Sequence, residues 1–120
     1  MNFYLLMRTF DPLGQLLWLQ RELEASETID EDVFIIMHIP LGTDFAIAKW
    51  NDVFNALMER FANTVVSLFS GHTHSDHLKF LTQSDDKSKV YMQNFIGNSL
   101  TTYSNYEPSF RVFKVDSDTN

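Results

Sequence analysis

Two kinds of hydrophobic pattern alternate along the first half of the chain. In residues 15–25 and 46–62, apolar side chains recur every three or four positions, which is typical of amphipathic helices. Residues 33–37 and 65–69 are short continuous apolar runs, which are typical of strands in a sheet that is covered on both faces. The order is therefore helix, strand, helix, strand, and a helical crossover predicts that the two strands are parallel.

The pattern changes after residue 77. Residues 78–82 partly alternate, residues 90–95 form a possible strand, and residues 110–115 alternate like a final half-exposed strand. These three short strands predict a meander that follows the helical part, and the fold class is α/β. Residues 1–8 are apolar but short, and they lack the basic start and cleavage site of a signal peptide, so we interpret them as a strand or the remnant of one.

Composition narrows the possible functions. A chain of 120 residues suffices for one small domain, and its net charge of −7 argues against a nucleic-acid-binding surface. An anionic substrate stays possible, because a bound metal can reverse the local field. The absence of cysteine excludes disulfides and thiolate metal sites within the chain, so any zinc would use histidine and carboxylate ligands. No apolar run has membrane-spanning length.

Two histidines follow the second predicted strand directly. Gly71 permits a sharp turn, and His72 and His74 are two positions apart, so in extended backbone their side chains share a face. Imidazole is the commonest neutral metal ligand and suits zinc, iron, nickel or copper. The alternative is a pair of ordinary polar loop residues, but the position after a buried strand and a glycine favours metal binding.

A third histidine follows the first predicted strand. His38 precedes a loop that contains Pro40 and Gly42, and taken alone it is equally well explained as a structural, hydrogen-bonded residue. Parallel strands, however, end at the same edge of a sheet, which is where ligands bind in such folds. We therefore expect His38, His72 and His74 to converge on one metal site.

Four ordered segments, including the Gly-His-x-His motif at residues 71–74, carry a resemblance to a known family. These segments are residues 11–19, 35–40, 71–76, and 98–103 with 108–116. The chain resembles the C-terminal half of the calcineurin-like metallophosphoesterases, and within them the branch of acid sphingomyelinase and the acid sphingomyelinase-like phosphodiesterases. One departure is Met37, where glycine is more usual in that branch.

The resemblance implies a domain and a metal site. The fold would be an αββα sandwich of two mixed sheets flanked by helices, and residues 1–120 would form a single partial domain, its C-terminal portion. Such a half-sandwich would expose apolar surface that its partner half should cover. By motif position, His38 and His72 would ligate one ion of a dinuclear zinc site, and His74 would ligate the other.

The family's other motifs, an Asp-x-His, a Gly-Asp-x-x-Asp and a Gly-Asn-His, are absent from this chain. They supply the bridging aspartate, the remaining ligands and the histidine that helps to protonate the leaving group, so we expect no catalytic residue here and no activity from this chain alone. The resemblance thus implies part of a secreted or lysosomal phosphodiesterase, with the missing N-terminal half as partner and a phospholipid or nucleotide-type phosphodiester as substrate. Two alternatives stay open: a truncated, non-catalytic half-domain with a binding or regulatory role, and an unrelated single-metal site.

A few residues near the motifs have competing interpretations. Asp76 could orient a liganding histidine or form a turn, and His77 is better explained as a surface strand residue. Thr101 and Tyr103 could line a substrate cleft, although ordinary strand positions explain them better. Arg111 is expected to face solvent or to pair with an acid rather than to contact phosphate.

Overall fold

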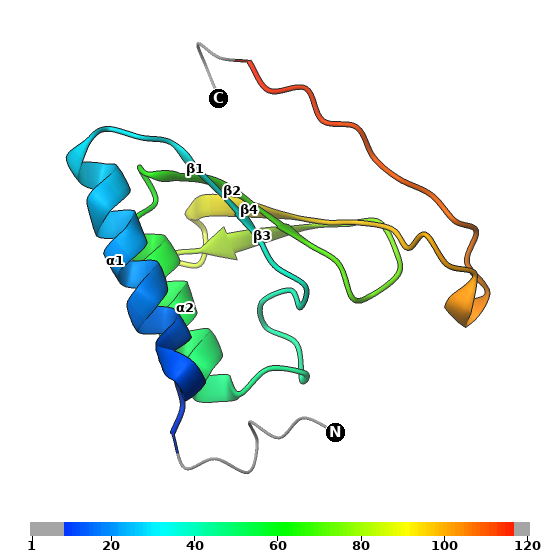
Figure 1. The fold of residues 1–120 in the computed structure, drawn as a ribbon, viewed down its shortest axis with the longest axis horizontal. Coiled ribbons are helices and arrows are strands. Elements are labelled where there is room, and N and C mark those ends of the chain that lie inside the picture. The colour runs from blue at the N-terminus through cyan, green and yellow to red at the C-terminus, as the bar shows by residue number, and fades with distance from the viewer. Residues whose placement is uncertain (1–8, 117–120) are drawn as a thin grey trace.

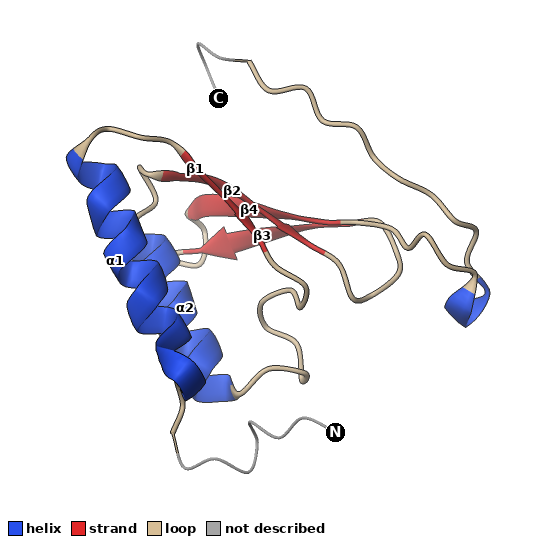
Figure 2. Ribbon diagram, viewed as in Figure 1, coloured by secondary structure: helices blue, strands red, loops and turns tan. Residues whose placement is uncertain are grey.

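A computed structural model describes residues 9–116 of the chain. After a short 3-10 turn, Pro12–Gly14, the helices and strands are α1 (Gln15–Thr28), β1 (Val33–Ile36), α2 (Ala48–Arg60), β2 (Val65–Ser70), β3 (His77–Thr82) and β4 (Val90–Ile96), followed by the 3-10 turn Tyr103–Asn105. The two helices lie together on one face of a four-stranded sheet (Figure 1, Figure 2). The α/β class predicted from the sequence is confirmed, while the predicted strand at residues 1–8 lies outside the described residues.

Both helices form where the hydrophobic period predicts them. In α1 the buried residues Leu16 and Leu23 are seven positions apart, or two turns, so they lie on one stripe. The Asp11 carboxylate accepts the backbone N–H groups of Leu16 (2.9 Å) and Leu17 (3.3 Å), which would otherwise lack partners at the start of the helix. Helix α2 likewise buries residues one turn apart, and no helix within residues 9–116 is long and apolar enough to cross a membrane.

The sheet confirms one topological prediction and corrects another. Strands β1 and β2 are parallel, as the helical crossover predicts. The later strands do not form a simple meander: β3 and β4 form an antiparallel hairpin, but β4 lies between β2 and β3 and pairs with β2 in parallel.

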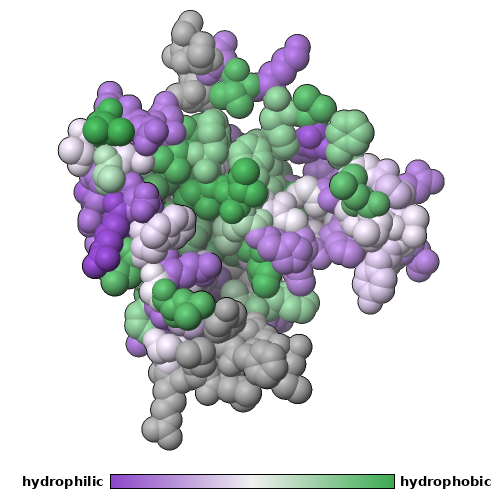
Figure 3. Space-filling view, in the orientation of Figure 1, coloured by the Kyte–Doolittle hydropathy of each residue, from purple (hydrophilic) through white to green (hydrophobic). Residues whose placement is uncertain are grey.

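The two faces of the sheet are packed very differently. On the helix face, Leu68 of β2 and Met58 of α2 are both 0% exposed. On the opposite face, which we call the open face, Phe34 is 41% and Ile36 is 84% exposed. The prediction that strand 33–37 is buried on both faces is therefore wrong, because in the described residues helices cover only one face. Figure 3 shows hydrophobic residues gathered in the region of the strands.

The C-terminal segment crosses the open face instead of joining the sheet. No strand forms at residues 110–115 within the described range, so that prediction is wrong. Phe113 packs edge-on against Phe69 of β2 and Phe95 of β4, with ring centroids 4.9 and 5.0 Å apart. One aromatic side chain thus covers part of the open face, and the expectation of exposed apolar surface holds for the rest.

Candidate metal centre

Backbone hydrogen bonds continue past the strand ends and hold the loops that carry the histidines. Beyond β1, Met37 donates its N–H to the Phe69 carbonyl (2.9 Å), and Gly71 donates to the His38 carbonyl (3.0 Å). Gly97, just after β4, donates to the Ser70 carbonyl (2.7 Å). The loops after β1 and β2 are therefore held side by side at one edge of the sheet, as parallel pairing requires.

Two of the three predicted histidines meet at this edge. Nε2 of His38 lies 3.2 Å from Nδ1 of His72, with the two rings nearly perpendicular. The ring of Phe45 packs edge-on against His72, with centroids 4.4 Å apart. The predicted convergence of His38 and His72 agrees with this geometry, and the packing of Phe45 restricts where the His72 ring can turn.

His74 does not join that pair. Its nearest ring neighbour is Tyr103, at a centroid distance of 5.8 Å, and its buried Nδ1 has no hydrogen-bond partner among the described residues. Within residues 9–116, no group of three or more His, Asp or Glu side chains is arranged to hold a metal ion. Whether His74 ligates a metal stays a prediction.

The backbone of the histidine loop explains why His74 points elsewhere. His72 and His74 both have left-handed backbone, with φ of 71° and 61°, and Thr73 donates its N–H to the Gly71 carbonyl (2.9 Å). The extended His-x-His assumed from the sequence is therefore wrong, and the sharp turn falls on the histidines rather than on Gly71. Left-handed backbone costs a non-glycine residue about 1–2 kcal/mol, and such outliers cluster at functional sites.

The His38–His72 pair fits two positions of a zinc site. Zinc–nitrogen bonds of about 2.0–2.1 Å at a tetrahedral angle place two ligand nitrogens about 3.3 Å apart, and the observed separation is 3.2 Å. The same separation also suits one hydrogen bond between two neutral imidazoles. A further ligand set would have to supply negative charge, because neutral imidazoles bring none.

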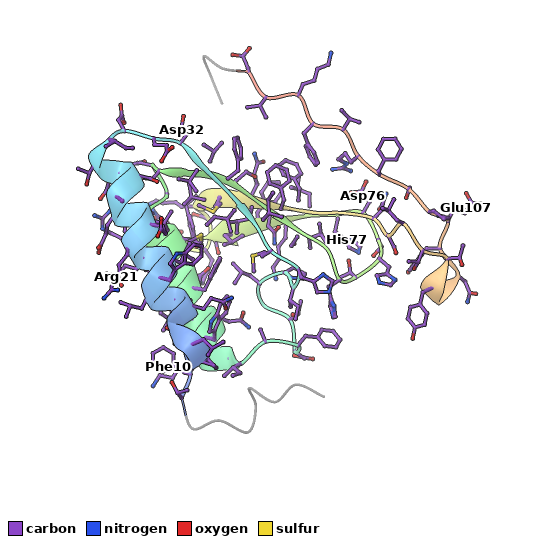
Figure 4. The ribbon with its side chains drawn as sticks, viewed as in Figure 1. Phe10, Arg21, Asp32, Asp76, His77 and Glu107 are labelled. Carbon is purple, nitrogen blue, oxygen red and sulfur yellow. The ribbon has the colours of Figure 1, made fainter. Side chains whose placement is uncertain are left out.

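The neighbouring residues have structural partners. Arg111 donates a hydrogen bond to Asp76 in an ion pair, so the prediction that Arg111 pairs with an acid is confirmed, and Asp76 anchors the C-terminal segment instead of orienting a histidine. Asp76 lies in the turn between β2 and β3, near that segment, and His77 begins β3 (Figure 4). His77 is an exposed strand residue, as expected, and its Nε2 lies 2.7 Å from Oγ of Ser75.

Thr101 and Tyr103 do not occupy strand positions. Tyr103 begins the second 3-10 turn, and its N–H is donated to Oγ1 of Thr101 (3.3 Å). The contact between the Tyr103 and His74 rings is the only feature that links this turn to the histidine loop among the ring contacts of the described residues. Their proposed place in a substrate cleft stays a prediction.

Sequence reasoning missed two features beside His38. One is Phe45, an isolated aromatic in the loop before α2. The other is a pocket of about 400 Å³ that we call the β1 groove; its lining includes Leu16 and Leu19 of α1, Ile36 of β1, His38 and Trp50. Neither feature follows from a periodic pattern, because loop 42–47 has none.

No family model matches the chain, but several curated proteins are similar to it over almost its whole length. It is 38% identical over 116 residues to sphingomyelin phosphodiesterase 2 of Caenorhabditis elegans, covering 96% of this chain and 19% of that protein. It is 39% identical over 124 residues to sphingomyelin phosphodiesterase B of Dictyostelium discoideum, covering 98% and 20%. For sphingomyelin phosphodiesterase of Homo sapiens, the values are 37% over 115 residues, 96% and 18%. The chain thus spans about a fifth of the length of these relatives.

Proposed function

We propose that this chain forms part of a longer phosphodiester hydrolase of the acid sphingomyelinase-like branch, because it is similar over nearly its whole length to sphingomyelin phosphodiesterases. Residues 1–120 would be the C-terminal portion of a calcineurin-like αββα domain. The open face of the sheet supports this proposal, because Phe34 and Ile36 present apolar surface that a second layer would bury. The same relationship suggests a secreted or lysosomal setting.

We propose that His38 and His72 are ligands of one zinc ion and that His74 is a ligand of a second. The observation that carries this proposal is the separation of 3.2 Å between Nε2 of His38 and Nδ1 of His72. Nδ1 of His74 is buried and has no hydrogen-bond partner among the described residues, which is compatible with a role as a metal ligand. When bound, a pair of metal ions can activate a water nucleophile and stabilise the attacking and leaving oxygens of a phosphodiester.

The chain's own residues would position the metal ions rather than transfer protons. Phe45 packs on His72, and the ion pair between Asp76 and Arg111 ties the histidine loop to the C-terminal segment. Three neutral imidazoles leave the charge of a bound cation uncompensated, so the edge would attract an anionic phosphodiester despite the net charge of −7. The missing N-terminal half would supply the bridging carboxylate and the acid for the leaving group.

For the substrate, we propose a phospholipid phosphodiester of the sphingomyelin type, because the similar proteins carry that name. A nucleotide-type phosphodiester is the alternative. Assay of both substrates with the longer protein separates them.

Comparing the zinc affinity of variants that each lack one histidine tests the metal proposal directly. Isothermal titration with zinc should show that His38→Ala and His72→Ala each weaken binding at least tenfold, because each removes a ligand. The matched control is His77→Ala, which removes an exposed histidine five residues from His72. Equal weakening by His77→Ala would contradict the assignment, and equal weakening of the same single ion by His74→Ala would favour the single-metal site.

Hydrolysis of bis(p-nitrophenyl) phosphate with added zinc tests whether the chain is incomplete. The isolated chain should show no activity above background, while a protein that includes the upstream region should hydrolyse the ester. In that longer protein, His72→Ala should lower the rate and His77→Ala should not. Robust hydrolysis by the 120-residue chain alone would refute the proposal that it lacks essential residues.

A second candidate is a non-catalytic half-domain with a binding or regulatory role. The separation of His74 from the His38–His72 pair favours it, since no three-residue metal group forms within the described part of the chain. On this alternative, the chain stays soluble and adding the upstream region restores no metal-dependent hydrolysis.

A further inference from the structure

A polar pocket of about 260 Å³ lies between α2, β3 and the loop that follows β1, and we call it the Lys79 pocket. Its polar side chains come from α2, from β3 and from the turn between β3 and β4: Asn51, Asp52, Asn55, Lys79, Thr82 and Lys87. No histidine lines it, so it is separate from the candidate metal centre.

The ammonium group of Lys79 has a fixed place in this pocket. Lys79 lies on the same face of β3 as the buried Leu81, so its side chain points toward the helices. The ammonium donates a hydrogen bond to the Leu41 carbonyl, and a Cβ atom at Gly42 would lie only 2.7 Å from Nζ. Because an ammonium has three N–H donors, two remain for a ligand.

Lys79 also lacks a compensating negative charge. Arg60, Lys89 and Arg111 each form an ion pair with an acid, whereas the half-buried Lys79 forms none among the described residues. The chain has 16 acidic residues against nine lysines and arginines, so the lack of a partner does not reflect a shortage of acids. A partly buried charge is costly unless it is paired, so an anion is the ligand that would compensate it. Lys87 adds a second positive charge to the lining.

The α2 side of the pocket presents hydrogen-bond acceptors. Oδ1 of Asn51 is buried and has no partner among the described residues, and Asp52 adds a carboxylate to the lining. Oδ1 of Asn55 already accepts the Tyr91 hydroxyl (2.9 Å), which leaves the N–H groups of that amide as donors. The pocket therefore offers donors for an anion together with acceptors that require a proton from the same ligand.

We propose that the Lys79 pocket binds a phosphate group that is accompanied by an O–H donor. Hydrogen phosphate itself has such a group, and so does a monoester whose alcohol part carries a hydroxyl. The phosphate oxygens accept hydrogen bonds from Lys79 and Lys87, and the O–H donates to Oδ1 of Asn51 or to Asp52. The volume of about 260 Å³ far exceeds the share of about 30 Å³ of one water molecule, so a small monoester has room.

A bound phosphate would connect three parts of the fold. Leu41 and Gly42 line the pocket beside residues of α2 and β3, so the ligand would hold the loop that begins at His38. The site needs no metal ion and does not rest on the proposed hydrolase activity. Its test and the zinc titration can therefore fail independently.

Isothermal titration of the metal-free chain with inorganic phosphate, glycerol 1-phosphate and sulfate tests the proposal at one ionic strength. At least one of the two phosphates should bind at least tenfold more tightly than sulfate, because sulfate has no O–H and leaves the acceptors of the pocket unpaired. Tighter binding of glycerol 1-phosphate identifies a monoester site, and tighter binding of inorganic phosphate identifies a site for the free ion. Equal affinity for all three probes, or binding of none, would overturn the proposal.

Substitutions locate the binding energy. Lys79→Met keeps the apolar stem, removes the ammonium and should weaken phosphate binding at least tenfold. The matched control, Lys89→Met, removes the same charge from the neighbouring turn outside the pocket and should change the affinity by about twofold or less. Lys87→Met replaces an exposed residue, so it serves if circular dichroism shows that Lys79→Met does not fold. Equal weakening by a pocket variant and by Lys89→Met would show a response to net charge alone and would refute the site.

Nuclear magnetic resonance gives the location without a substitution. Inorganic phosphate should shift the amide signals of Gly42, Asn51 and Thr82 along one saturation curve, and it should leave those of Gly71 and His72 in place. Shifts confined to Gly71 and His72 would assign the anion to the histidine loop and would exclude the Lys79 pocket.

Discussion

The two faces of the sheet are made from the same strands but differ in how they are packed. On the helix face, Met58 of α2 and Leu68 of β2 have no exposed surface, whereas Ile36 and Phe80 on the open face are 84% and 55% exposed. Both faces are apolar, so the difference lies in the layer that covers each one and not in the composition of the strands. The helix face is a fully packed core. The open face has the apolar composition of a core, but among the described residues only the C-terminal segment covers it.

Truncation of a side chain at the centre of the helix face should have the largest effect on stability. Met58→Ala removes a fully buried side chain and leaves a cavity, which costs about 2–5 kcal/mol of the free energy of unfolding. Urea denaturation monitored by circular dichroism measures the loss. A change below 1 kcal/mol would mean that the helices do not form a packed core on this face.

The partial cover of the open face should contribute less. Phe113→Ala removes the two edge-on contacts with Phe69 and Phe95, and we expect a loss of about 1–2 kcal/mol. Increased binding of a hydrophobic dye should accompany it, because the sheet loses its aromatic cover. Phe110→Ala is the matched control, since Phe110 is 79% exposed. Equal effects of both substitutions would show that the segment is not held by Phe113.

The pH dependence of stability tests the helix face through Tyr91, a tyrosine that joins β4 to α2. The Tyr91 hydroxyl donates a hydrogen bond to Asn55, 2.9 Å from Oδ1, so Tyr91→Phe should cost about 1 kcal/mol. Burial, aided by the nearby Glu59 carboxylate, raises the pKa of Tyr91 to about 12 from its ordinary value of 10.0. The folded state thus favours the neutral hydroxyl, so this stability is complete below pH 10 and is lost as pH rises toward 12.

Absorbance of tyrosinate measures this titration. The titration should contain a late component near pH 12, and Tyr91→Phe should remove it. Identical titration curves for the unaltered chain and Tyr91→Phe above about pH 11 would contradict the burial of this hydroxyl.

The smallest effect should come from Ile36, an exposed residue of the edge strand β1 on the open face. Ile36→Ala deletes a side chain that is already in solvent, so the free energy of unfolding should change by about 0.5 kcal/mol or less. The same denaturation series measures it beside Met58→Ala. A loss as large as that of Met58→Ala would show that Ile36 is covered by something outside residues 9–116.

The helical part of the fold follows from the sequence because its signals are local. The apolar stripe that contains Leu16 and Leu23 fixes α1, and the crossover through α2 fixes the parallel pairing of β1 and β2. The place of β4 is not local in this sense. A turn joins β3 to β4 as a hairpin, but it does not specify which of the two strands docks on β2.

The alternating pattern of residues 110–115 gave a wrong prediction of a strand for a related reason. Such a pattern indicates that one side of an extended segment is covered, and Phe113 meets that condition by packing edge-on against Phe69 and Phe95 on the open face. Backbone pairing is a separate property, and alternation alone does not require it. The open face also explains why the apolar run at residues 33–37 predicted two-sided burial that the described residues do not provide.

The sequence predicts the part of the candidate site that depends only on where the strands end. His38 and His72 follow parallel neighbouring strands, and this placement alone brings them together. The orientation of His74 depends on left-handed backbone at both histidines of the motif, His72 and His74, and no local sequence pattern predicts that conformation. Phe45 contributes through a loop without periodicity, so its contact with His72 appears only in three dimensions.

The insertion of β4 between β2 and β3 has a consequence for the order of folding. The β3–β4 hairpin joins residues that are close in sequence, whereas Leu68 of β2 and Asn94 of β4, which pair in parallel, are 26 positions apart. Contacts that close short loops form faster than those that close long ones. We therefore expect the hairpin to assemble first and then dock as a unit, so that the histidine loop, which leads from β2 into the hairpin, takes its final shape only at that late step.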